Sequence, residues 1–158
     1  MKIRSWLLQL MLVAACLVVT LFAVFLFPRF PARLYQVYGN QITAWFFGAG
    51  IYGAAVSFYV AAWLASRLLF AADHNQAFTT RVVQLLRWLK WSTAAMTLAI
   101  CGTLPQIYVA TQSEDAPGMM LIGLCFTAVP LVVTIFLAIL QRLWQTALQY
   151  KEENDLTI

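Results

Sequence analysis

Four apolar runs, each long enough to cross a lipid bilayer, constrain the fold of this chain more than any other feature. They occupy residues 6–27, 42–66, 88–110 and 118–140. At about 1.5 Å rise per residue, helices of this length cover the roughly 30 Å hydrocarbon core of a membrane. A soluble chain of 158 residues could not bury four such runs on every side, because its core would be too small. The runs therefore predict an all-α, polytopic membrane protein with four transmembrane helices in a single domain, residues 1–158.

The distribution of lysine and arginine predicts which ends of the helices face the cytoplasm. Eight basic residues would lie on one side of the membrane or at its boundary: Lys2, Arg4, Arg67, Arg81, Arg87, Lys90, Arg142 and Lys151. Only Arg29 and Arg33 would lie on the other side. Because cytoplasmic loops are enriched in basic residues, this imbalance places both termini, the connection at residues 67–87 and the tail at residues 141–158 in the cytoplasm. The topology accounts for the net charge of +4, and no direct binding of nucleic acid is predicted.

The first apolar run has a second interpretation, as a removable signal. Residues 13–16, Val-Ala-Ala-Cys, resemble the cleavage box of a lipoprotein, which would make Cys16 a lipidation site. The run continues through residue 27 and reaches full spanning length, which favours an uncleaved helix.

Residues that could carry catalysis or bind a metal are scarce. None of the four runs contains an acid or a histidine, so proton relays and ion coupling have no carrier there. The single histidine, His74, follows Asp73 in a polar connection and has no second histidine to work with. The cysteines Cys16, Cys101 and Cys125 fall inside apolar runs without metal-ligand spacing. We therefore predict a protein that is not an enzyme and that has no catalytic, cofactor-binding or metal-binding residue.

A stripe of small residues along the second run predicts close helix packing. Its members are Gly53, Ser57, Ala61 and Ala65 at four-residue spacing, with Gly50 and Ala54 beside them. Small side chains let two backbones approach, and this matters in lipid because no hydrophobic force drives helices together there. The stripe could meet a helix of the same chain, which we favour, or a second copy in a homo-oligomer.

Two prolines, Pro105 and Pro130, interrupt the third and fourth runs. Each removes one backbone hydrogen bond from its helix and leaves a carbonyl that needs another partner. The polar residues near enough in sequence to help are Thr103, Gln106, Thr127 and Thr134. One interpretation is a structural kink, which we favour. The other is a hinge or a broken-helix binding site of the kind that transporters use.

Two cytoplasmic motifs suggest a family. The chain ends in Glu153-Asn154-Asp155-Leu156-Thr157-Ile158, and the connection between the second and third runs contains Phe78-Thr79 followed by Val83, Leu86 and Leu89. With these motifs and four spans, the chain resembles bacterial membrane proteins grouped as a domain of unknown function. The resemblance implies a multi-pass protein of the bacterial cytoplasmic (inner) membrane.

The same resemblance implies a partner. Genes of such proteins are often found beside a gene for a small helix-turn-helix regulator, an arrangement that looks like a membrane protein tethering a cytoplasmic DNA-binding protein. The predicted partner-binding residues are Phe78, Thr79, Glu153, Asn154, Asp155, Leu156, Thr157 and Ile158. We predict such a tether, with the lipid bilayer and this regulator as partners. The alternatives are a small oligomeric transporter or channel subunit, whose pore would use the small-residue stripe and the prolines, and a purely structural membrane protein.

Overall fold

The computed structural model describes residues 2–25, 29, 41–73 and 79–155, and the regular elements within these ranges are all helices. They are α1 (Lys2–Phe25), α3 (Gln41–Asp73), α4 (Thr80–Cys101), α5 (Leu104–Ser113) and α6 (Pro117–Asp155). Four stretches of the described chain are long and apolar enough to cross a membrane: Trp6–Phe25, Ile42–Ala71, Thr80–Ser113 and Pro117–Lys151. The third stretch comprises α4 and α5. The predicted all-α fold with four spanning helices is confirmed.

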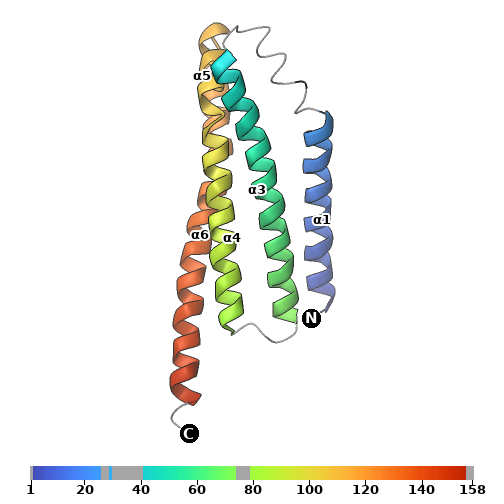
Figure 1. The fold of residues 1–158 in the computed structure, drawn as a ribbon, viewed down its shortest axis with the longest axis vertical. Coiled ribbons are helices and arrows are strands. Elements are labelled where there is room, and N and C mark those ends of the chain that lie inside the picture. The colour runs from blue at the N-terminus through green and yellow to red at the C-terminus, as the bar shows by residue number, and fades with distance from the viewer. Residues whose placement is uncertain (1, 26–28, 30–40, 74–78, 156–158) are drawn as a thin grey trace.

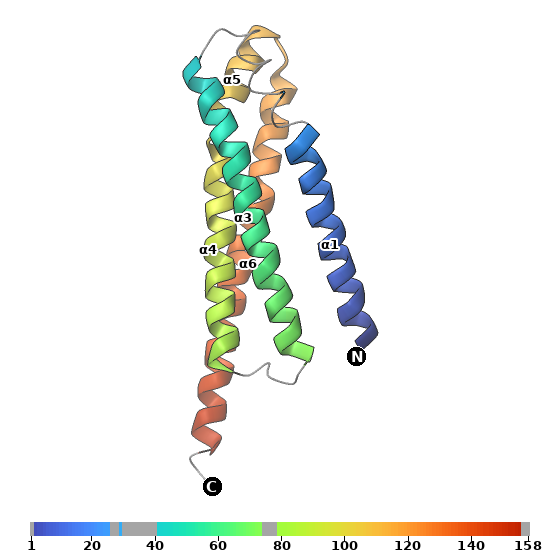
Figure 2. The ribbon, with the colours of Figure 1, turned by 45° about the vertical axis from the view of Figure 1, so that its right-hand side comes forward.

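The helices run side by side as an elongated bundle (Figures 1 and 2). Helix α4 packs along both α3 and α6, whereas α1 lies at the edge and packs chiefly on α3. The start of α1, the end of α3, the start of α4 and the end of α6 lie at one end of the bundle, which we call the terminal end. Helix α5 and the start of α3 lie at the opposite end, which we call the α5 end.

The best-buried apolar cluster lies toward the terminal end, where α3, α4 and α6 meet. Its members are Leu64, Val82, Leu86, Leu89 and Leu137. Val82, Leu86 and Leu89 fall four and three residues apart and so share one face of α4. In contrast, large apolar side chains such as Leu98 are exposed on the outside of the bundle. This distribution is expected when lipid, and not water, surrounds the helices.

The third span is split just before Pro105. Helix α4 ends at Cys101 and α5 begins at Leu104, with the proline in the first turn of α5. Pro105 has no backbone N–H to donate to the Cys101 carbonyl, so the α-helical hydrogen-bond ladder cannot continue there. The chain tightens instead: the backbone N–H of Thr103 donates to the Ile100 carbonyl at 2.9 Å, and the Thr103 hydroxyl donates to the same oxygen at 2.7 Å.

Pro130, by contrast, lies inside one continuous helix, α6. Pro130 leaves one carbonyl of the preceding turn without its backbone donor. The two nearest threonines do not bond that carbonyl. The Thr127 hydroxyl donates to the Gly123 carbonyl at 2.9 Å, and the Thr134 hydroxyl lies 2.8 Å from the Pro130 carbonyl. Thr134 Oγ1 also lies 3.0 Å from Thr93 Oγ1, which joins α6 to α4.

Two helices run further toward the terminal end than their apolar runs do. Helix α3 continues past residue 66 to Asp73, and α6 continues past residue 140 to Asp155. Most of the added residues are good helix formers, and elongating an existing helix needs no new nucleus.

Reporter fusions are expected to place residues 75 and 158 on the same side of the membrane as the N-terminus. Fusions at residues 34 and 115 should report the opposite side. The imbalance of basic residues predicts that the first side is the cytoplasm. Paired fluorescent-protein and alkaline-phosphatase fusions measure this directly, and phosphatase activity from a fusion at residue 158 would reverse the orientation.

Candidate functional site

Some of the predicted partner-binding residues lie within the described structure, and these are at the terminal end. Thr79 occupies the N-cap position of α4 with extended backbone angles (φ −129°, ψ 151°), and its carbonyl accepts a hydrogen bond from the Val82 N–H at 3.0 Å. Glu153 is exposed in the last turn of α6, and the backbone of Asn154 and Asp155 completes that helix. Phe78 and residues 156–158 lie outside the described residues.

These residues do not form one compact patch within the described chain. Trp144 of α6 packs on the same cluster as Val82 of α4, so α6 passes the start of α4 near Trp144. Glu153 lies nine residues further along α6, which is ~13 Å of helix. Thr79 and Glu153 therefore mark two separate levels of the terminal end.

The part of α6 beyond Trp144, residues 145–155, forms a helical projection that we call the C-terminal extension. It reaches past the ends of the neighbouring helices in both views (Figures 1 and 2). Gln145, Gln149, Lys151 and Glu153 are exposed along it. Because the C-terminal extension is the last part of one continuous helix, the packed part of α6 fixes its position.

The predicted small-residue stripe lies mainly against α4 of the same chain. A β-carbon at position 50 would lie 2.6 Å from the Ala99 carbonyl oxygen, and one at position 53 would lie 3.4 Å from the Ala99 β-carbon. The Ser57 carbonyl accepts a hydrogen bond from the Ser92 hydroxyl at 2.8 Å. Ala61 and Ala65 pack against the buried leucine cluster. Of the two glycines of the stripe, Gly50 lies closer to the backbone of α4.

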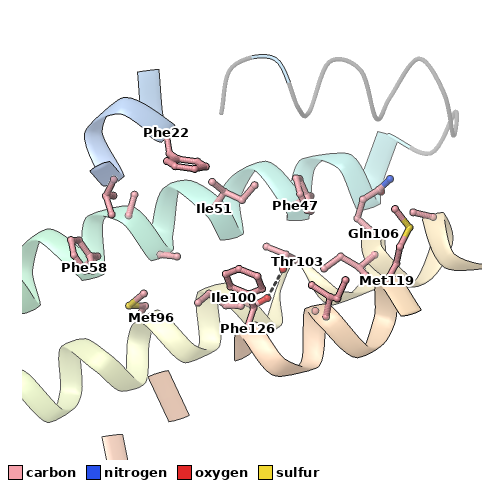
Figure 3. A pocket seen from close by; sticks show the side chains of 17 residues that line it. Phe22, Phe47, Ile51, Phe58, Met96, Ile100, Thr103, Gln106, Met119 and Phe126 are labelled. Carbon is pink, nitrogen blue, oxygen red and sulfur yellow. Dashed lines mark hydrogen bonds between the residues drawn. The ribbon is translucent and has the colours of Figure 1, made fainter. Parts of the chain in front are cut away.

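Ala54, the remaining residue of the stripe, lines a cavity of about 740 Å³ (Figure 3). Every helix of the described chain contributes to its wall. The lining residues are Val19 and Phe22 from α1; Phe47, Ile51, Ala54, Ala55 and Phe58 from α3; Met96 and Ile100 from α4; Thr103; Gln106, Ile107 and Ala110 from α5; and Met119, Ile122, Gly123 and Phe126 from α6. Thr103 and Gln106 are the polar side chains among them.

Gln106 is the residue whose role the sequence did not reveal. We expected it to help satisfy the backbone near Pro105. Instead its side chain is only 1% exposed, and neither Oε1 nor Nε2 has a hydrogen-bond partner in the described structure. The available signal was a glutamine within an apolar run, one residue after a helix-breaking proline.

The described residues contain no group of three or more histidine, cysteine, aspartate or glutamate side chains that could hold a metal ion. Cys16, Cys101 and Cys125 are free thiols at separate positions in the bundle. Among the described residues, the buried side-chain atoms without a hydrogen-bond partner are Gln106 Oε1, Gln106 Nε2 and Gln141 Oε1.

Comparison with known proteins identifies the family. Residues 29–158 match the family described as a protein of unknown function, DUF2975. The chain is also similar to the uncharacterized membrane protein YoaS of Bacillus subtilis strain 168, with 34% identity over 108 residues, which is 68% of each chain. No solved structure matches the chain. With its four spanning helices, this chain is a membrane protein that belongs to the DUF2975 family.

Proposed function

We propose that this chain is a protein of the bacterial cytoplasmic (inner) membrane that tethers a small helix-turn-helix regulator at the bilayer. The observation that carries the proposal is the C-terminal extension. It projects from the bundle at the same end as the end of α3 and the start of α4. A partner in the water beyond the membrane surface could bind this helix without entering the lipid.

The charge of the extension suits a basic partner. Its last turn contains Glu152, Glu153 and Asp155 against the single Lys151. DNA-binding proteins carry positively charged surfaces, and complementary charge speeds association and favours the correct partner. An acidic helix on that surface would compete with DNA phosphates, so the tether would also hold the regulator away from its operator.

The apolar end of the chain offers a second contact. Leu156 and Ile158 follow the acidic turn in the sequence, and Phe78 precedes Thr79 in the connection before α4. A short segment with alternating apolar anchors can dock in a groove or add to a partner's surface. The charged turn would then bring the partner close, and the apolar residues would slow its release.

Channel activity has less support. The cavity is lined by apolar side chains together with Thr103 and Gln106, and no charged side chain takes part among its lining residues. Ions moving through such a space would lose their water without gaining ligands.

Deletion of Asn154–Ile158 combined with Phe78→Ala is expected to release the regulator from the membrane. The measurement is purification of the full chain, tagged at the N-terminus, from native membranes, followed by mass spectrometry of bound proteins. We expect a basic helix-turn-helix protein with the unaltered chain, reduced about tenfold in the double variant, which corresponds to ~1.4 kcal/mol of binding free energy. Raising the salt concentration should weaken recovery as well, because exposed charge pairs are screened.

The matched control is Glu114→Ala with Asp115→Ala, which removes two acids from the turn at the α5 end. This control should leave recovery of the regulator unchanged. Equal recovery from the control and from the double variant would rule out tethering through the terminal end.

A further inference from the structure

The cavity described above has an unused hydrogen-bonding group at one place in its wall. The Thr103 hydroxyl already donates a hydrogen bond to the Ile100 carbonyl. The Gln106 side chain makes no hydrogen bond with the described residues. Its carbonyl oxygen Oε1 can accept one and its amide Nε2 can donate one, and both atoms are buried without a partner. Because buried polar groups in proteins are almost always hydrogen bonded, this carboxamide would be stabilised by a partner. Both of its polar atoms lie against the protein with almost no accessible surface, so a molecule in the cavity would reach them once the side chain turns toward it.

The shape of the cavity indicates what kind of molecule this is. Its wall follows α3 from Phe47 to Phe58, about three turns or ~16 Å. Gln106 lies beside Phe47 at one end of this length, whereas Phe58 and Met96 lie at the other (Figure 3). A cavity that is polar at one end and apolar along the rest matches a molecule with a small polar head and a hydrocarbon chain. Its volume, about 740 Å³, lies within the range of ordinary ligand pockets.

The position of Gln106 fits the depth of a lipid head. It lies two turns before the end of α5 at Ser113, or ~10 Å from that end of the bundle. The cavity then runs from Gln106 toward the middle of the membrane. A molecule bound in this way would have the same orientation as the lipids of the adjacent leaflet.

Access from the bilayer is available beside α1. This helix supplies Val19 and Phe22 to the wall, but it packs chiefly on α3, where Thr20 Oγ1 lies 2.7 Å from Tyr59 Oη. Since no water-filled route is needed, the ligand can enter sideways from lipid.

We propose that the cavity binds an uncharged, single-chain lipid alcohol, with its hydroxyl on the Gln106 carboxamide and its chain along α3 toward Phe58. A hydroxyl fits because it donates to Oε1 and accepts from Nε2, so one small group satisfies both atoms. A ketone or ether would satisfy only Nε2, and a carboxylate or ammonium would carry a charge that the apolar wall cannot solvate. The site does not depend on the proposed tethering of a regulator.

The test uses the full chain in phospholipid nanodiscs and a dodecanol analogue with a photoactivatable diazirine at the far end of its chain. Cross-linking is expected near Phe58 and Met96. Unlabelled 1-dodecanol should compete, while dodecane and dodecyl methyl ether should compete at least about tenfold less well, the difference attributable to one good hydrogen bond. Mass spectrometry of lipids extracted from the purified chain separates an alcohol taken from the cell from a phospholipid of the bilayer.

Three variants sharpen the test. Gln106→Leu should bind dodecanol about tenfold more weakly while melting at the same or a higher temperature without ligand, because it removes an orphaned polar group. Ala54→Phe should abolish cross-linking by filling the cavity. Gln149→Leu, a glutamine exposed on the C-terminal extension, should behave like the unaltered chain.

Two results would overturn the proposal. One is equal competition by dodecane and dodecanol, which would show a cavity filled by hydrocarbon alone. The other is undiminished labelling of a folded Ala54→Phe variant, which would place the probe elsewhere. Neither result bears on the capture of a regulator by the terminal end, so the two proposals fail separately.

Discussion

Leu86→Ala is expected to lower the free energy of unfolding by about 2–5 kcal/mol. Leu86 is 1% exposed and lies in the cluster that joins α3, α4 and α6. Truncation removes its contacts within this cluster and leaves a cavity that the surrounding backbone can close only in part. The measurement is the apparent melting temperature of the purified chain in detergent, followed through its tryptophan fluorescence.

Leu98→Ala provides the matched control, since Leu98 lies on the same helix but is 73% exposed. Its side chain faces lipid or detergent, which fills the space after truncation. A melting temperature lowered equally by both variants would show that α4 does not hold the bundle together through this cluster.

Gly50→Ala is expected to destabilise the bundle by about 1–3 kcal/mol, although alanine is the better helix former. The new β-carbon would lie 2.6 Å from the Ala99 carbonyl oxygen and 2.7 Å from the Thr103 methyl carbon. The first neighbour is backbone, so α3 and α4 must move apart. Apparent melting temperature in detergent again reports the change.

Two other glycines provide controls for this substitution. A β-carbon at position 53 would meet the Ala99 β-carbon at an ordinary 3.4 Å, and one at position 118 would meet no atom within 4 Å. Gly53→Ala and Gly118→Ala should therefore be close to neutral. If Gly50→Ala has the same melting temperature as these two variants, α3 and α4 do not approach each other closely at this position in the protein.

The spanning helices could be predicted from sequence because each is specified locally. A run of apolar residues in lipid must satisfy its own backbone, and the helix is the form in which one segment can do so. The same holds for the end of α4: Pro105 withholds a donor from the Cys101 carbonyl, and the effect lies within a few residues of its cause. The effect of each proline on its helix, a split just before Pro105 but a continuous helix through Pro130, was not predictable from the proline alone.

The contacts between helices could not be read in the same way. The spacing of Gly50 and Gly53 predicts a small-residue face, but their different clearances arise from where Ala99 lies on another helix. Gln106 is a stronger example, since a glutamine can face a neighbouring helix, a carbonyl or a cavity with the same sequence around it. Its unpartnered state depends on which side chains of the neighbouring helices lie beside it.

The continuity of α6 has a mechanical consequence. Pro130 removes one backbone hydrogen bond near the middle of the helix, so bending costs least there. From Pro130 to Asp155 the helix is an arm of about 25 residues, or ~37 Å, and a bend of ~5° at the proline would move its tip by ~3 Å. That displacement is about one hydrogen-bond length. A small change in packing beside the proline would thus be amplified into making or breaking a contact at the far end of the arm.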